Sequence, residues 1–177
     1  DSKLLALQFD DMYLPLTGAN SAASLASKPV RFVLMDEVDK YPPRSGGGRE
    51  ADPISLAKER TNTFSYNKKI FITSTPTLKT GSIWKEWESC TRKLFYYLPC
   101  PHCGKYQRLR FHQIKFAKEG TKTQRAETAY YECPYCQGHI TDADKQKMLR
   151  QGKWMSEEEP EGVRPSRKKT GFAINAI

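Results

Sequence analysis

Two pairs of cysteines constrain the fold of this chain more than any other feature. Within each pair two residues separate the cysteines, and 29 residues lie between the pairs. Two such turns can present four thiolates to one ion, which is the arrangement of a closed, tetrahedral zinc site. Since four of the five cysteines fall in these pairs, the pattern favours a metal over disulfides. The predicted ligands of a structural Zn²⁺ are Cys100, Cys103, Cys133 and Cys136.

The residues around the cysteines predict a small β subdomain, a zinc ribbon, over residues 93–140. Apolar and alternating runs indicate its strands. The expected elements are a strand at 94–98, a strand pair within 106–116, a strand at 128–132 and a following helix over 142–151. A site closed by four sulfur atoms has no open position for a catalytic water. We therefore expect the metal to be structural, with His102 and His139 lying beside the site rather than binding the ion.

The ribbon region is strongly basic, in a chain whose net charge is +9. Residues 92–125 contain nine lysines and arginines and one acidic residue. Aromatic side chains are interspersed among them: Tyr96, Tyr97, Tyr106 and Phe111. Basic strands with exposed aromatics fit contact with a nucleic-acid backbone. The alternative, which we prefer for most of these aromatics, is that they form the small core that a zinc subdomain needs.

The N-terminal half predicts part of an α/β sheet. Residues 30–35 form an apolar run interrupted only by Arg31, which is typical of a strand buried on both faces. A glycine-rich loop that we expect to be mobile, a helix starting at Asp52-Pro53 and a strand at 69–73 follow. This order predicts two parallel strands in one sheet. Further expected elements are a hairpin within 3–17, a helix over 22–27 capped by Ser21, and a helix opening at 81 or 82.

Polar residues follow both predicted strands. Asp36 and Glu37 end the first strand, and Ser74 and Thr75 follow the second. Ligands of open α/β sheets bind at this carboxyl edge. There, one carboxylate can hold the Mg²⁺ of a nucleoside triphosphate while its neighbour activates the attacking water. Each motif alone also fits an ordinary strand end or a Ser/Thr turn, but their occurrence on consecutive parallel strands favours ATP hydrolysis.

The glycine-rich phosphate loop of such an ATPase is absent from these 177 residues. That loop ends in Lys-Ser or Lys-Thr, and the glycines at 46–48 lack the lysine and follow the acidic strand. We therefore expect either that the loop lies outside this sequence or that the chain is no ATPase. In the first case, the sequence is a fragment that should be inactive alone.

Several segments, in this order, resemble the large terminase subunit of lambda-like tailed phages and prophages. They are residues 18–25, 33–39, 59–61 and 74–77, the two cysteine pairs, and residues 171–175. The resemblance covers nearly the whole chain. It implies a partial P-loop-type parallel sheet, the Walker B half of an ATPase domain, followed by the zinc ribbon. The implied domains are the ATPase half (1–92), the ribbon (93–140), a helix and linker (141–170) and the start of a nuclease domain (171–177).

The resemblance also implies roles for individual residues. Asp36 would be the Walker B residue that holds Mg²⁺, and Glu37 the catalytic glutamate. Ser74 and Thr75 would couple hydrolysis to movement, and Arg60 could stabilise the charge that develops on the phosphate.

At the level of the whole protein, the resemblance implies an ATP-driven motor with an endonuclease, which cuts concatemeric DNA and pumps it into procapsids. The expected partners are double-stranded phage DNA, the small terminase subunit, the portal of the procapsid and further copies of the chain in a ring. The expected location is the cytoplasm of the bacterial host, and no apolar run approaches the ~20 residues that span a membrane. Two alternatives remain open: a non-catalytic zinc-ribbon module that binds nucleic acid or protein, and a helicase-like ATPase of another system.

Overall fold

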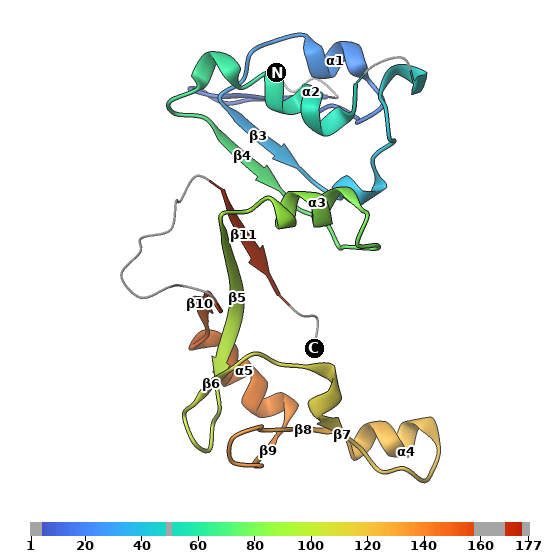
Figure 1. The fold of residues 1–177 in the computed structure, drawn as a ribbon, viewed down its shortest axis with the longest axis vertical. Helices are drawn as coiled ribbons and strands as arrows, with labels where there is room; N and C mark the ends of the chain where they lie inside the picture. The colour runs from blue at the N-terminus through green and yellow to red at the C-terminus, as the bar shows by residue number, and fades with distance from the viewer. Residues whose placement is uncertain (1–4, 49–50, 158–168, 175–177) are drawn as a thin grey trace. The chain divides into compact units, whose positions relative to one another are not determined.

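The computed structural model describes residues 5–48, 51–157 and 169–174. The chain forms two compact units, residues 1–88 and residues 89–177. Both mix helices with small sheets (Figure 1). None of the helices in the described ranges is long and apolar enough to cross a membrane.

A parallel strand pair is the centre of unit 1. β3 (Phe32–Met35) and β4 (Lys69–Ile72) pair in register, with Met35 opposite Ile72. α2 (Pro53–Glu59) lies between them in the sequence, because parallel neighbours need a crossover connection. The predicted strand–helix–strand order and the parallel pairing are confirmed.

The core of unit 1 lies on one face of this pair. α1 (Ala22–Ala26) and α2 cover that face (Figure 1). The buried residues are Leu25, Met35, Val38, Ile54 and Ala57. On the opposite face Phe32, Leu34 and Phe71 are 48%, 71% and 59% exposed. The prediction that the first strand is buried on both faces is wrong, since the described residues provide helices for one face only.

The other elements of unit 1 can be compared with the capping residues and turns predicted from the sequence. The Asp52 carboxylate accepts hydrogen bonds from the amides of Ile54 (2.9 Å) and Ser55 (3.3 Å), so it caps α2 as predicted. Ser21 does precede α1, but its hydroxyl bonds to the Ser24 hydroxyl rather than to a backbone amide. The remaining elements are the antiparallel hairpin of β1 (Ala6–Gln8) and β2 (Tyr13–Pro15), α3 (Ser82–Glu88), and the 3-10 turns η1 (Val38–Lys40), η2 (Gly46–Gly48) and η3 (Asn62–Phe64).

The glycine-rich loop is anchored at its centre. Ser45 is fully buried, and its hydroxyl donates to the carbonyl of Ala19 over 2.7 Å. The amide of Gly46 donates to the carbonyl of Asn20 over 3.2 Å. These contacts hold the described part of the loop, which we expected to be mobile, against the turn that precedes α1.

Unit 2 is built around the long strand β5 (Arg92–Pro99). β10 (Lys153–Met155) pairs with it antiparallel and β11 (Thr170–Ala173) pairs with it parallel. Residues 171–173, where the resemblance places the start of a nuclease domain, therefore belong to a strand of the β5 sheet in this structure. Most of the predicted linker, residues 158–168, lies outside the described residues. A second sheet has the order β7 (Ile114–Lys115), β8 (Tyr130–Glu132) and β9 (His139–Ile140).

Two details of unit 2 differ from the prediction. The strand pair expected within 106–116 is wrong: β6 (Tyr106–Gln107) pairs with β5, whereas β7 pairs with β8. The 3-10 turn η4 (Phe111–Gln113) separates the two short strands, which belong to different sheets. The unpredicted α4 (Lys122–Glu127) begins with a capping box between Thr121 and Gln124. α5 (Asp142–Arg150) is confirmed, and at its start the Asp144 carboxylate accepts hydrogen bonds from the amide (3.0 Å) and the hydroxyl (2.8 Å) of Thr141.

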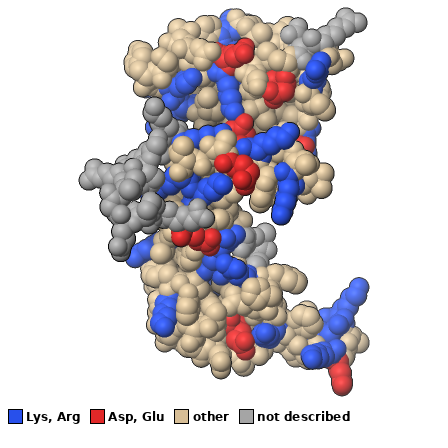
Figure 2. Space-filling model, viewed as in Figure 1, with Lys and Arg blue, Asp and Glu red and all other residues tan. Residues whose placement is uncertain are grey.

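Charge is spread over both units. On the face shown in Figure 2, lysine and arginine atoms are interspersed with acidic atoms and do not form one continuous basic patch. Several cations of the basic segment have partners within unit 2. Arg108 lies 3.4 Å from the carboxylate of Glu157 and 3.8 Å from the ring centroid of Phe95, and Lys115 lies 3.9 Å from Glu132.

Candidate metal centre and strand-edge site

The four predicted zinc ligands converge in unit 2. Cys100 follows β5 directly, Cys133 follows β8 directly, and all four Sγ atoms lie within 4.8 Å of one another. The Sγ atoms of Cys100 and Cys136 are 3.8 Å apart, and those of Cys103 and Cys133 are 4.0 Å apart. A tetrahedral zinc with bonds of about 2.3 Å has sulfur–sulfur edges of about 3.8 Å. The donor set therefore fits Zn²⁺, and these distances are too long for disulfides, whose sulfur atoms are about 2.05 Å apart.

The same backbone turn presents the sulfur atoms twice. In the first turn, the amide of His102 points at Cys100 Sγ (3.4 Å) and the amide of Gly104 donates to the Cys100 carbonyl (2.9 Å). In the second, the amides of Tyr135 and Gln137 make the corresponding contacts to Cys133, at 3.5 and 2.9 Å. Gly104 and Gln137 both have positive φ, at 71° and 58°. Each turn thus aims backbone amides at a sulfur that carries negative charge as a thiolate.

The thiols of Cys100 and Cys133 have pKa values that are shifted in opposite directions. Burial raises the pKa of Cys100 to about 12. Burial also acts to raise the pKa of Cys133, but hydrogen bonds, led by those from the amides of Tyr135 and Cys136, outweigh it and lower that pKa to about 7. A bound divalent cation would supply the charge that keeps all four groups deprotonated. Metal binding at this site should therefore release protons.

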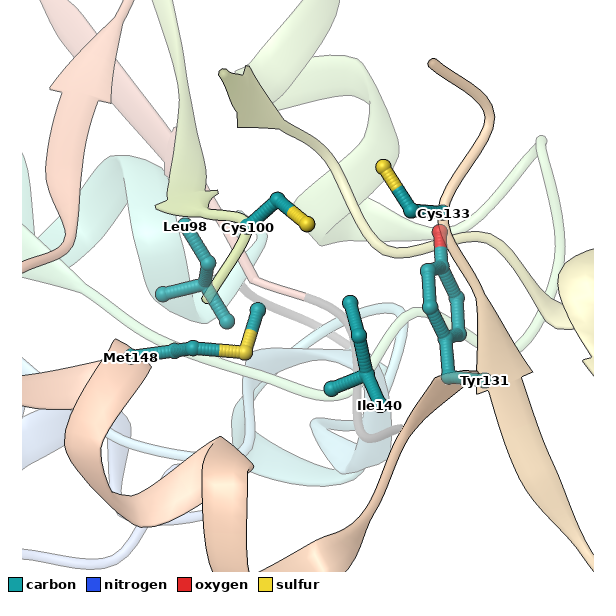
Figure 3. Packing of buried hydrophobic residues seen from close by; sticks show 6 residues of the cluster. All are labelled: Leu98, Cys100, Tyr131, Cys133, Ile140 and Met148. Carbon is teal, nitrogen blue, oxygen red and sulfur yellow. The ribbon is translucent and has the colours of Figure 1, made fainter. Parts of the chain in front are cut away.

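The site is part of the core of unit 2. Figure 3 shows Cys100 and Cys133 above Leu98, Tyr131, Ile140 and Met148, which are all buried. The buried Gln107 donates from Nε2 to Cys133 Sγ over 3.7 Å, a contact that sequence reasoning missed because no spacing rule relates a residue of β6 to a ligand. His102 Nε2 lies 2.7 Å from the carbonyl oxygen of His139. The two histidines thus lie beside the cluster, as expected, and link its two turns.

Parallel pairing brings the two polar strand ends of unit 1 together. The amide of Thr73, just after β4, donates to the carbonyl of Met35 (2.9 Å), and the amide of Val38 donates to the carbonyl of Thr73 (3.3 Å). Asp36 and Glu37 therefore lie beside the segment that contains Ser74 and Thr75, at one edge of the sheet. Asp36 is exposed and the Glu37 side chain is 43% exposed, so both carboxylates reach solvent.

Glu37 has an unusual backbone conformation. Its φ of 56° and ψ of 42° are left-handed, which costs a residue other than glycine about 1–2 kcal/mol. Its carboxylate lies 3.0 Å from Lys40 Nζ. Such backbone conformations cluster at functional sites, where the surrounding structure holds them. Here the hydrogen bond from Val38, the next residue, fixes the turn.

Asp39 is the residue of this edge that sequence reasoning missed. Its carboxylate accepts hydrogen bonds from the Thr77 amide (3.0 Å), the Thr77 hydroxyl (3.2 Å) and the Ile83 amide (2.8 Å). Its own amide donates to Ser74 Oγ over 3.2 Å. Burial alone would raise the pKa of Asp39, but hydrogen bonds from Ile83, Thr77 and Ser82 outweigh it and lower the pKa below 3.8.

Arg60 lies at the end of α2, and its guanidinium contacts the end of α1. It donates to the carbonyl of Ser24 over 2.8 Å and to the carbonyl of Lys28. Burial lowers the pKa of Arg60. In this conformation Arg60 joins α1 to α2, and its role toward a nucleotide stays a prediction.

Comparison with known proteins gives the family of the chain. The family model of the phage terminase large subunit gpA, ATPase domain, matches residues 1–154. The chain belongs to this family. It is also 30% identical over 146 residues to the terminase, large subunit, of Enterobacteria phage P21. This match covers 79% of the chain and 21% of that relative, so the chain spans about a fifth of the relative's length. No solved structure matches the chain.

In this member of the gpA family, the aromatics of the basic segment have mostly structural contacts. The Tyr96 hydroxyl donates to the carbonyl of Leu149 (2.7 Å), and the Tyr106 hydroxyl donates to that of Gln151 (3.2 Å). The Tyr97 hydroxyl bonds to Glu157 over 3.0 Å. Phe111 differs, because it is 77% exposed. The interpretation that most of these aromatics form the small core is confirmed for Tyr96, which packs against the core cluster of unit 2, and stays a prediction for Tyr97 and Tyr106.

Proposed function

We propose that this chain carries the water-activating and coupling residues of an ATP-driven motor that packages phage DNA. The observation that carries the proposal is the edge of the parallel pair, where Asp36 and Glu37 lie beside the segment containing Ser74 and Thr75. Membership of the gpA ATPase family supports it, because an acidic strand end is where such enzymes hold their metal and water.

In this proposal each residue has one task. Asp36 binds the Mg²⁺ that accompanies ATP, since carboxylate oxygens are ligands that Mg²⁺ prefers. Glu37 orients the attacking water and takes its proton. Ser74 and Thr75 detect the loss of the γ-phosphate, and Arg60 remains the candidate for stabilising phosphate charge. The proposal also requires a phosphate loop that binds ATP, and the sequence of such a loop is not among these 177 residues.

Glu37→Gln tests the proposal in a complete large subunit that contains this segment. Removing a general base typically slows catalysis by about 10²–10⁴-fold, so DNA-dependent ATP hydrolysis should fall at least about 100-fold. ATP binding should be retained, because the amide keeps the size of the carboxylate. Glu59→Gln, at the exposed end of α2, is the matched control and should leave turnover unchanged. Turnover that survives Glu37→Gln would rule out Glu37 as the base.

For unit 2 we propose a zinc ribbon with one structural Zn²⁺ on the four cysteines. The sulfur–sulfur distances and the amides directed at the sulfur atoms support this assignment. The ion would hold together the two turns, one after β5 and one after β8, that supply its ligands. The exposed Phe111, beside Arg110, is the part of this unit best suited to contact DNA.

The activity of the whole protein is a proposal that rests on family membership. It comprises cutting of concatemeric DNA by an endonuclease, translocation into procapsids, and action in the host cytoplasm. The proposed partners are double-stranded DNA, the small terminase subunit, the portal and further copies in a ring. A zinc-ribbon binding module without catalysis is the second candidate, favoured by the cysteine cluster. The wild-type arm of the Glu37 experiment separates the two, since a binding module hydrolyses no ATP.

A further inference from the structure

Asp39 joins three segments of unit 1 through its two carboxylate oxygens. Oδ2 accepts from the amide and the hydroxyl of Thr77, which lies beyond β4. Oδ1 accepts from the amide of Ile83 in the first turn of α3. Asp39 itself belongs to η1, directly after the turn that contains Asp36 and Glu37. One side chain thus connects the proposed catalytic turn, the proposed coupling segment and a helix.

The backbone of η1 also forms hydrogen bonds with the segment that follows β4. The Asp39 amide donates to Ser74 Oγ (3.2 Å), and the amide of Val38 donates to the carbonyl of Thr73 (3.3 Å). A shift of residues 73–77 would therefore act on η1 at three points. η1 begins next to Glu37, whose left-handed backbone has little freedom to absorb such a shift.

We propose that Asp39 is a positioning residue that transmits movement between the Glu37 turn, residues 74–77 and α3. This inference rests on the proposed ATPase function and adds a residue to it. A carboxylate suits the task because both of its oxygens only accept hydrogen bonds. The amide of asparagine offers one acceptor and would turn its amino group toward one of the donors, Thr77 or Ile83.

Gly81 gives a second way to disturb the same carboxylate. A Cβ at position 81 would lie 2.6 Å from Asp39 Oδ2 and 2.9 Å from Oδ1. Gly81→Ala therefore pushes the carboxylate away from its donors while Asp39 stays in place. Asp52→Asn is the matched control, since Asp52 also accepts two backbone amides at the start of a helix in unit 1 but makes none of its hydrogen bonds to residues 73–77.

The experiment compares these three variants with wild type in the complete large subunit. It measures ATP hydrolysis and DNA translocation together, and reports the length of DNA moved per ATP. For Asp39→Asn and Gly81→Ala this ratio should fall below that of wild type, because hydrolysis continues while a smaller share of it moves DNA. Asp52→Asn should keep the wild-type ratio. A loss of folded protein lowers both rates equally and leaves the ratio unchanged, so the ratio distinguishes positioning from stability.

Amide hydrogen exchange on the same proteins tests the link itself. In Asp39→Asn and Gly81→Ala, protection should fall at Thr77 and Ile83, whereas in Asp52→Asn it should fall at Ile54 and Ser55 only. Wild-type hydrolysis with an unchanged ratio in both Asp39→Asn and Gly81→Ala would overturn this inference and leave the proposed function standing. An inactive wild type would overturn both. Unchanged exchange at Thr77 and Ile83 would overturn the link whatever the ratio.

Discussion

Loss of one cysteine ligand should unfold the ribbon unit. Cys103 is the informative position, because it lies toward the surface whereas Cys100 and Cys133 are buried. Cys103→Ser removes a metal ligand without placing a new polar atom in the core. Any loss of stability in this variant therefore measures the contribution of the metal.

The expected effect is large. Two of the six buried residues in the core cluster around the site are themselves ligands, so loss of the metal also frees part of this cluster. A structural zinc contributes roughly 10–16 kcal/mol of apparent binding free energy at neutral pH. The net stability of a whole domain is about 5–15 kcal/mol. A ribbon that loses its zinc should thus lose its cooperative unfolding transition.

The assay combines metal content with a thermal melt. Wild type should contain one zinc per chain and lose it to a chelator together with protection from hydrogen exchange in β8. Cys103→Ser should contain little zinc and show no melt for this unit. Cys90→Ser is the matched control, since its sulfur is not among the four of the cluster, and it should keep the metal and the melt. A Cys103→Ser protein with wild-type melting and exchange would refute a structural role for the metal.

Two further predictions concern packing and capping in unit 2. In a denaturant titration, Gly152→Ala should lower the free energy of unfolding by about 1–3 kcal/mol, because the new Cβ would lie 2.3 Å from the Tyr96 ring. Gly18→Ala is the control and should have little effect, because no atom lies within 4 Å of the position of its Cβ. Hydrogen bonds from Thr141, chiefly from its amide and next from its hydroxyl, hold the pKa of Asp144 below 3.8. The cap therefore stabilises α5 above pH 3.8. This stabilisation is lost as the pH falls through the lower pKa that Asp144 has in the folded state. Amide exchange at Thr141 against pH should show this loss in wild type, and an Asp144→Asn protein that shows the same acid transition would contradict it.

Sequence reasoning succeeded where a feature depends on neighbouring residues. The cysteine turns were predictable because two residues between ligands allow little other geometry, and α2 was predictable because Asp52-Pro53 is a strong helix start. The parallel pairing of β3 and β4 followed from the helix between them. The capping box of α4, at Thr121 and Gln124, was present in the sequence but was overlooked in a polar segment.

Features that depend on distant segments were not predictable in the same way. β6 pairs with β5 and β7 pairs with β8, and the sequence of residues 106–116 does not indicate these two pairings. Gln107 reaches a cysteine sulfur 26 positions away. Asp39 reads as an ordinary polar residue after a strand, and its importance is visible only when Thr77 and Ile83 are placed beside it.

The exposed face of β3 shows how a correct physical rule gave a wrong prediction. A continuous apolar strand is typical of a sheet covered on both sides, and Phe32, Leu34 and Phe71 follow that rule in composition. Burial, however, belongs to the assembled layers, and the described residues place α1 and α2 on one side only. The apolar pattern of β3 therefore predicts the strand itself, whereas the burial of its second face does not follow from the residues of the strand.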